Sequence, residues 1–220
     1  SLTDLEKKVM ASAQRSRTSY MDAASSIAKL GLNARDAFGS MDEVIAFQEL
    51  INKQFIIGGA SVQEQQAAMI QLTQAMASGV LRGEELNSVF EQAPGIIQSI
   101  ADYLDVSIGE IRAMAAEGQL TADVVKNAMF AAADDIETKF SNMPKTWGQI
   151  WIGMKNKALS IFNPILNKVN QVANSEKFTQ VTNGVINGLA GIASVATVVL
   201  DLLIGGAALV VDNWSWLAPI

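Results

Sequence analysis

The feature that most constrains this chain is the alternation of helix-start and helix-stop signals over residues 1–141. A hydroxyl residue followed three positions later by a glutamate favours a helix start, because each side chain satisfies a backbone N–H group that the helix leaves free. The pattern occurs at Thr3…Glu6, Ser40…Glu43, Ser61…Glu64 and Ser107…Glu110. Thr121 adds a fifth cap, with Asp123 in the first turn, where the helix dipole favours negative charge. Glycines typical of helix ends lie between these starts, at Gly31, Gly39, Gly58-Gly59, Gly79 and Gly118.

These signals predict a string of short helices over residues 3–15, 18–30, 41–57, 62–78, 84–92, 95–104, 108–117 and 122–141. Apolar residues recur at helical spacing inside them, and one such face holds Val44, Phe47, Ile51 and Phe55. No run of alternating apolar and polar residues is long enough to predict a strand. The expected fold class is therefore all-α, with many short helices in a compact bundle, followed by longer amphipathic and hydrophobic helices.

Charge and hydropathy divide the sequence into three predicted parts. Residues 1–143 form an acidic multi-helix domain, because residues 1–138 carry 19 acidic and 10 basic side chains. Residues 144–183 form a basic amphipathic helical segment with five lysines and one glutamate. Residues 184–220 form a hydrophobic helical segment that is truncated at its end. The chain begins with a polar stretch that is no signal peptide. Because it lacks an initiator Met and ends abruptly after Trp214-Ser215-Trp216, we interpret it as a fragment of a longer protein.

An apolar stripe at helical spacing runs through the basic segment. Its members are Trp147, Ile150, Trp151, Met154, Ala158, Ile161 and Phe162. Lys155 and Lys157 lie off its centre, and Asn163-Pro164 is predicted to restart or kink the helix. Two interpretations stay open. The stripe belongs to a long helix packed on the acidic domain, or it is a surface for a membrane or a partner helix.

The stretch Gly184–Val211 is almost entirely apolar and is interrupted only by Asn187 and Asp201. Its charge-free part, residues 184–200, would span about 26 Å as a helix at about 1.5 Å per residue, against about 30 Å for a bilayer core. A membrane span is therefore compatible with this stretch but not required by it. Gly184 and Gly188 have the spacing that permits close helix packing. Outside a membrane, we expect the stretch to fold back over the apolar stripe or to drive self-association.

The composition excludes several kinds of chemistry. The chain has no Cys and no His, which rules out disulfides, thiolate catalysis, Ser-His-Asp triads and Cys/His zinc sites. The adjacent carboxylates Glu84 and Glu85 point about 100° apart on a helix, so they do not face one substrate as a glycosidase pair does. We interpret them as first-turn acids favoured by the helix dipole. The sequence predicts no catalytic, metal or cofactor site, and the acidic front argues against specific nucleic-acid binding.

One long stretch of the chain has a distinctive succession of short motifs. They are Ser78-Gly79, residues 81–88 (LRGEELNS), residues 91–95 (EQAPG), residues 106–112 (VSIGEIR) and residues 117–121 (EGQLT). In this order they resemble the tape measure proteins of long-tailed phages and prophages, and the resemblance covers roughly residues 18–172. The positions that carry it, as structural motif residues, are Gly79, Leu81, Arg82, Gly83, Glu84, Glu85, Leu86, Gln92, Pro94, Gly95 and Gly118.

The resemblance implies a structural, non-enzymatic function without cofactors. Such proteins lie in the tail tube, set its length during assembly in the bacterial cytoplasm, and leave the tail when DNA is ejected toward the host envelope. The implied partners are the tail tube, other tail assembly proteins and further copies of the chain. A string of short helices is compact and not a rod, so this fragment is either part of the ruler or an anchoring domain. The alternative from the residues themselves is a membrane-active helical protein that stores a hydrophobic hairpin and contacts a membrane through residues 184–211.

Overall fold

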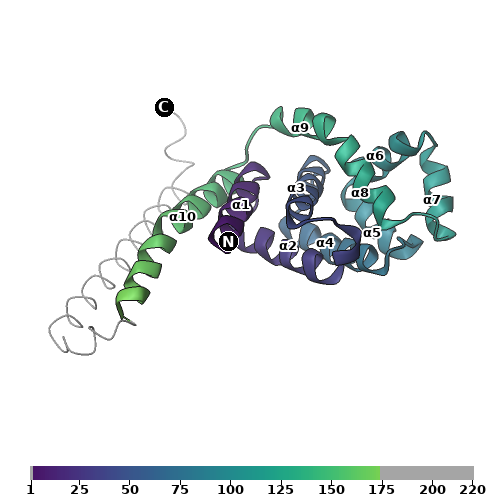
Figure 1. Ribbon diagram of the computed structural model, residues 1–220. Coiled ribbons are helices and arrows are strands. Elements are labelled where there is room, and N and C mark those ends of the chain that lie inside the picture. The colour runs from purple at the N-terminus through teal and green to yellow at the C-terminus, as the bar shows by residue number, and fades with distance from the viewer. Residues whose placement is uncertain (1, 174–220) are drawn as a thin grey trace, which may run out of the picture. The chain divides into compact units, whose positions relative to one another are not determined.

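The computed structural model describes residues 2–173, which form ten α-helices and one short 3₁₀ helix (Figure 1). The elements are α1 (Leu2–Arg15), α2 (Tyr20–Asn33), η1 (Arg35–Ala37), α3 (Met41–Ile57), α4 (Val62–Ser78), α5 (Gly83–Gln92), α6 (Pro94–Leu104), α7 (Ile108–Ala116), α8 (Ala122–Ala131), α9 (Ala133–Ser141) and α10 (Trp147–Ala173). No strand occurs among these residues, and the all-α prediction is confirmed. Residues 1–161 form one compact unit, and the described part of the second unit, residues 162–173, is the later part of α10.

Most of the predicted helix starts are confirmed by their side-chain caps. The hydroxyl oxygens of Ser40, Ser61, Ser107 and Thr121 each accept a hydrogen bond from the backbone N–H three residues later. The caps at Ser61 and Ser107 are complete capping boxes, because the glutamate side chain also accepts from the backbone N–H of the serine. The start predicted at Thr3 is wrong, since α1 already begins at Leu2.

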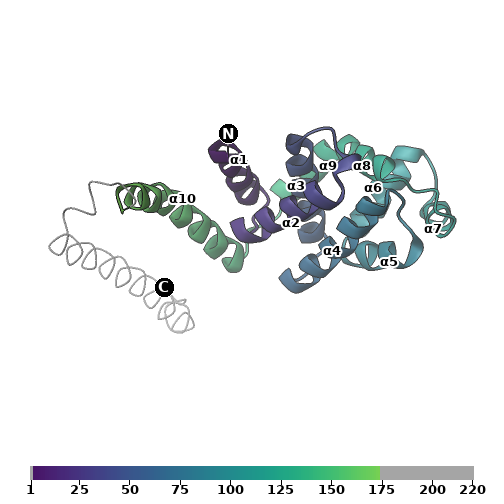
Figure 2. The same ribbon diagram turned by 60° about the horizontal axis from the view of Figure 1, so that its bottom comes forward.

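Several predicted helix boundaries differ from the structure. Gly31 does not end α2, which continues to Asn33. The helix predicted over residues 122–141 is divided at Ala132 into α8, which packs mainly on α6, and α9, which packs on α3 (Figure 2). The restart predicted at Asn163-Pro164 is also wrong. The missing N–H of one proline does not end α10, which runs unbroken to Ala173.

Helix α3 lies in the middle of the bundle and contacts α1, α2, α6, α8 and α9 (Figure 1). The predicted apolar face is buried, because Phe47, Ile51 and Phe55 are completely enclosed. Polar residues of α3 are buried as well, among them Glu49 and Lys53. A central helix that is enclosed on nearly all sides therefore organises the residues considered below.

Candidate functional site

Two of the motif glycines end helices in the left-handed conformation. Gly79 follows α4 with φ +76°, and Gly118 follows α7 with φ +71°. Glycine adopts this conformation without the steric penalty that a Cβ atom brings. A Cβ atom at Gly118 would also lie 3.4 Å from Cγ1 of Val80. Both positions therefore allow the chain to turn sharply beside another segment.

The segments that leave these two turns pair with each other. Residues 79–81 meet residues 120–122 in an isolated antiparallel bridge, in which Leu81 N–H donates to the carbonyl oxygen of Leu120 at 2.7 Å. The side chains of Leu81 and Leu120 are both fully buried. Residues 79–81 thus link the end of α4 to the start of α8, with α5, α6 and α7 between them in the chain.

The motif continues into the start of α5. Arg82 occupies the N-cap position without a side-chain capping bond, and Gly83, Glu84 and Glu85 form the first turn. Leu86 is 1% exposed and belongs to the hydrophobic core.

The motif residues 91–95 (EQAPG) form the sharp junction between α5 and α6, and this junction packs against the end of α3. Pro94 takes the first position of α6, one residue before the predicted start of this helix, where its missing N–H costs no hydrogen bond. A Cβ atom at Gly95 would collide with the side-chain amide of Gln54. In a second close contact between α3 and this junction, a Cβ atom at Gly58 would lie only 2.5 Å from the carbonyl oxygen of Gln92. The described motif residues thus occupy turn, helix-start and packing positions, whereas Gly184, Gly188 and Asp201 lie outside the described residues.

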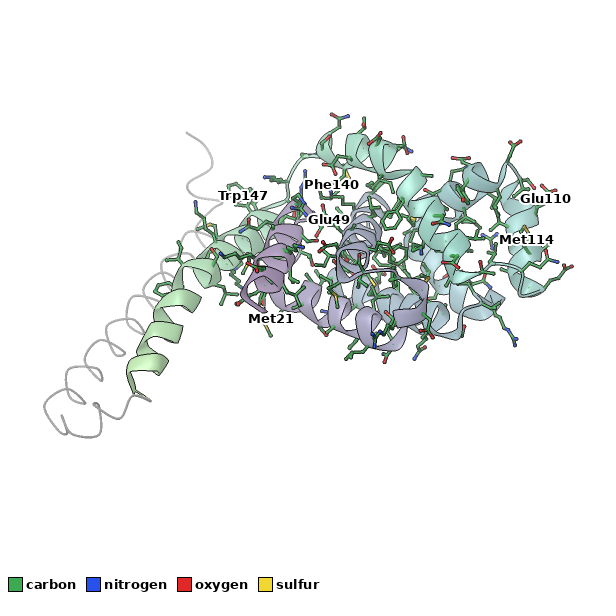
Figure 3. All side chains as sticks on the ribbon, in the orientation of Figure 1. Met21, Glu49, Glu110, Met114, Phe140 and Trp147 are labelled. Carbon is green, nitrogen blue, oxygen red and sulfur yellow. The ribbon has the colours of Figure 1, made fainter. Side chains whose placement is uncertain are left out.

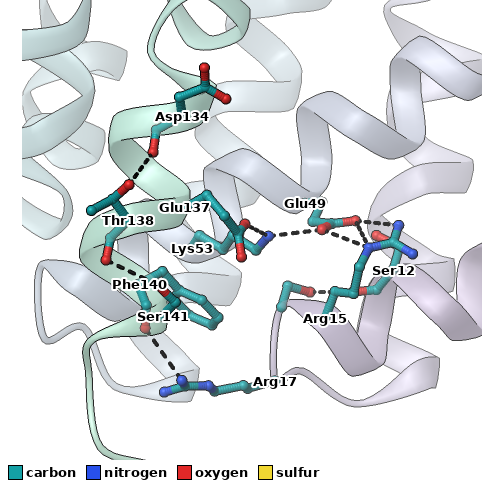
Figure 4. Close-up of polar contacts among 11 residues, drawn as sticks. Ser12, Arg15, Arg17, Glu49, Lys53, Asp134, Glu137, Thr138, Phe140 and Ser141 are labelled. Atoms are coloured by element: carbon teal, nitrogen blue, oxygen red, sulfur yellow. Dashed lines mark hydrogen bonds and ion pairs between the residues drawn. The ribbon is translucent and has the colours of Figure 1, made fainter.

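A cluster of charged side chains joins α1, α3 and α9 on another side of α3 (Figure 4). Glu49 accepts hydrogen bonds from Arg15 at 2.7–3.2 Å and from the Lys53 ammonium at 2.9 Å. Lys53, whose side chain is 3% exposed, also pairs with Glu137. Burial raises the pKa of Glu49, but the hydrogen bonds from Arg15 and Lys53 outweigh burial and hold that pKa below its ordinary value. The cluster borders an open cavity of about 620 Å³.

The turn between α1 and α2 contacts the end of α9. Arg17 has a left-handed backbone with φ +54°, which is uncommon for a residue with a side chain. Its guanidinium carbon lies 4.3 Å from the centre of the Phe140 ring, and Nη2 donates to the Phe140 carbonyl oxygen at 3.3 Å. The cluster and this contact hold helices together. In residues 2–173 no group of three or more acidic side chains is arranged to hold a metal ion.

The same turn also holds α10, which begins at Trp147 (Figure 3). Asn156 is 2% exposed and bonds twice to the turn. Its Oδ1 accepts from Tyr20 N–H at 2.8 Å, and its Nδ2 donates to the Thr18 carbonyl oxygen at 2.7 Å. Gln149, seven residues earlier on the same face, accepts from Arg17 at 3.5 Å.

The apolar stripe of α10 does not make this contact. At about 100° per residue, its members over residues 147–161 point away from Asn156. Met154 is 58% exposed and Ile161 is 56% exposed. The helix is thus held on the acidic domain, as one of the two interpretations has it, but by its polar face and not by the apolar stripe. Within the part of the chain that the structure describes, no helix is long and apolar enough to cross a membrane.

Sequence reasoning missed the residues that join the helices. The pair Glu49 and Lys53 was a usable signal, because an acid and a base lie four residues apart on a helix that is predominantly apolar. Gln149 and Asn156 were another, since they lie on one face of a helix whose opposite face is apolar. Nothing local indicated Arg17, whose role depends on residues more than a hundred positions away.

The comparisons with known proteins give one match. A family model described as tape measure protein matches residues 1–167. No curated protein and no solved structure matches the chain.

Proposed function

Because the chain belongs to the tape measure protein family, a family of structural phage tail components, we propose that it is part of the protein that sets tail length during tail assembly. The observation that carries the proposal is the match over residues 1–167, which includes every motif residue that the structure describes. In this role the chain lies in the interior of the tail tube in the virion, after assembly in the bacterial cytoplasm. It reaches the host envelope when DNA is ejected.

The compact bundle supports an anchoring role for this fragment. A ruler lengthens in proportion to its residues only if it is extended, whereas residues 1–161 fold into one unit around α3. We infer that the measuring part lies in other helical sequence of the same protein, and that this domain contacts tail assembly proteins. We also propose that it associates with further copies of itself. Its buried charges bond to one another in pairs that connect helices, which supports a structural and non-enzymatic role.

Tail length tests the proposal. A block of helical sequence downstream of this fragment is deleted or duplicated in the parent gene, and tails are measured by electron microscopy. Tails should shorten and lengthen by about 1.5 Å per residue. The matched control replaces the block by a helical sequence of equal length and should leave the tails unchanged. Tails of constant length after deletion and duplication would contradict the proposed role of the protein in setting tail length.

The alternative function, a membrane-active helical protein, depends on residues 184–211, which lie outside the described residues. It predicts that the 220-residue chain releases dye from vesicles of anionic lipid. Constant tail length together with dye release would favour this alternative.

A further inference from the structure

The side of α10 that points away from Asn156 is a continuous apolar surface with a lysine at each edge. At about 100° per residue, its six apolar members fall within an arc of about 100° centred opposite Asn156. Lys155 and Lys157 each lie about 80° from the direction opposite Asn156, one on either side of it. We call the arc the outer face of α10, and its members are Trp147, Ile150, Trp151, Met154, Ala158 and Ile161.

The hydrogen bonds of Asn156 leave the outer face accessible from outside the bundle. Both bonds are made to main-chain groups of the turn between α1 and α2, so they fix the rotation of α10 about its axis. Met154 and Ile161 are 58% and 56% exposed, and the two lysines at the edges are exposed as well. A flat surface can therefore reach the outer face while α10 stays attached to the bundle.

The charged residues of α10 all have the same sign. No Asp or Glu occurs in residues 147–173, whereas residues 1–138 carry 19 acidic and 10 basic side chains. A helix with an apolar face, basic edges and a polar opposite side is typical of helices that lie in the interface of an anionic bilayer. On such a helix the aliphatic parts of the lysines cover apolar surface while their ammonium groups reach the lipid phosphates. The charge of α10 therefore complements an anionic lipid surface.

We propose that the outer face of α10 binds the surface of a bilayer that contains anionic lipid, with the helix axis in the plane of the membrane. Met154 and Ile161 enter the boundary between headgroups and acyl chains. Trp151 lies at the depth of the headgroups, because an indole ring is favoured at the membrane interface. The ammonium group of Lys155 lies 5.8 Å from the centre of that ring, so it is placed beside the same headgroups.

The acidic side chains of the bundle do not cancel the attraction of the lysines to lipid. Asn156 contacts the bundle on the side of α10 opposite the outer face, so this contact lies behind a helix about 10 Å across. The Debye length at physiological ionic strength is about 8 Å. Charges behind α10 are therefore screened from the lipid more strongly than Lys155 and Lys157 are.

Fluorescence at single cysteines tests the contact directly, because the chain has no cysteine of its own. In the full chain, an environment-sensitive fluorophore at Met154→Cys or Ile161→Cys should shift to shorter wavelength with vesicles of equal parts phosphatidylglycerol and phosphatidylcholine. A quencher attached to the lipid should reach it. Ser160→Cys, exposed on the side of α10 toward Asn156, is the matched control and should not shift. Vesicles of phosphatidylcholine alone should bind at least about tenfold more weakly.

Substitutions separate the contribution of charge from that of apolar surface, with the fluorophore at position 161 as the reporter. Lys155→Gln and Lys157→Gln should each weaken binding to the anionic vesicles about fivefold. Lys29→Gln removes an exposed lysine from α2 and should leave binding unchanged. Met154→Gln should weaken binding about tenfold. Leu32→Gln, at a side chain that is 80% exposed on α2, is its matched control and should bind as the unsubstituted chain does.

Four results would overturn the proposal. Vesicle binding without a shift at Met154→Cys would assign membrane contact to residues outside the outer face. A shift before vesicles are added would assign the face to a second copy if it depends on chain concentration, and to another part of the same chain if it does not. Equal shifts with anionic and uncharged vesicles would remove the role of the lysines. No shift with either kind of vesicle would leave the face to a protein partner.

The inference deepens the proposed arrival of the chain at the host envelope and rests on it. Fluorescence reports membrane contact and electron microscopy reports tail length, so failure of one is distinguishable from failure of the other. A parent protein that sets tail length while its α10 shows no shift would keep the tape measure role and lose the lipid contact.

Discussion

Substitutions at the neighbouring glycines Gly58 and Gly59 should destabilise the protein for different reasons, and their order of severity should reverse. Gly58 has an ordinary helical backbone with φ −71°, so alanine adds no backbone strain there. Its Cβ atom, however, would lie 2.5 Å from the carbonyl oxygen of Gln92 and 3.2 Å from Cα of Ala93. An ordinary contact begins near 3.4 Å, so α3 and the junction between α5 and α6 would have to separate by about 0.9 Å. Overpacking of this kind costs about 2–3 kcal/mol.

Gly59 presents the opposite situation. Its φ is +79°, and nothing lies within 4 Å of a Cβ atom built there. Alanine should therefore cost about 1–2 kcal/mol through backbone strain alone, and asparagine should cost less because it tolerates the left-handed conformation. At Gly58 the larger asparagine should cost at least as much as alanine. The expected order is Gly58→Asn at or above Gly58→Ala, but Gly59→Asn below Gly59→Ala.

Urea unfolding followed by far-UV circular dichroism measures the four variants. With an m value of about 2 kcal/mol/M, Gly58→Ala should lower the urea midpoint by about 1 M. Gly109→Ala is the steric control, because its nearest neighbour would be Ser107 Oγ at 3.8 Å, and it should stay within about 0.5 kcal/mol of the unsubstituted chain. The same order of alanine and asparagine at both glycines would refute the reasoning, as would a Gly58→Ala variant as stable as Gly109→Ala.

Three further predictions concern the polar contacts. Glu49 has a lower pKa in the folded chain than in the unfolded chain, so its ionised form stabilises the fold above its ordinary pKa of 4.5. This stabilisation is lost as the pH falls through the folded pKa. Between about pH 6 and about pH 3, the urea midpoint should therefore fall more steeply for the unsubstituted chain than for Glu49→Gln. Lys53→Met leaves Glu49 with Arg15 as its charged partner and should cost up to about 3 kcal/mol, whereas Lys8→Met removes an exposed pair and should cost less than about 0.5 kcal/mol. Asn156→Ala should raise amide hydrogen exchange in residues 147–161 about tenfold through the loss of bonds worth about 1–2 kcal/mol, and Ser160→Ala should leave exchange unchanged.

The sequence predicted the helices well wherever their signals are local. The caps at Ser61 and Ser107 depend only on a hydroxyl and a carboxylate three residues apart. The sequence pattern alone therefore predicts the capping contact. The break at Ala132 has no local signal, because no glycine or proline marks it. The helices on either side of it differ in their main neighbour, α6 for α8 and α3 for α9, and no window of sequence contains these neighbours.

The motif residues show the same division. Gly79 and Gly118 were recognisable as helix ends, but the bridge between their segments joins residues that are distant in the sequence. Proline is a local sign of a helix start at Pro94, whereas the close approach at Gly95 comes from the side chain of Gln54 on α3. Sequence patterns identified which positions matter, and the partner that each position serves required the structure.

The outward orientation of α10 follows from where main-chain groups need partners. The first N–H groups of a helix have no partner within it, and the carbonyl groups of a tight turn are in the same situation. The turn before α2 leaves Tyr20 N–H and the Thr18 carbonyl oxygen in this state, and Asn156 satisfies both because its amide carries an acceptor and a donor side by side. An apolar residue at position 156 would leave two partly buried polar groups without these bonds, and an unmet hydrogen bond of a buried group is costly. Periodicity locates an apolar face correctly, but the face that docks is chosen by all the groups at the contact, and here the polar groups decide it.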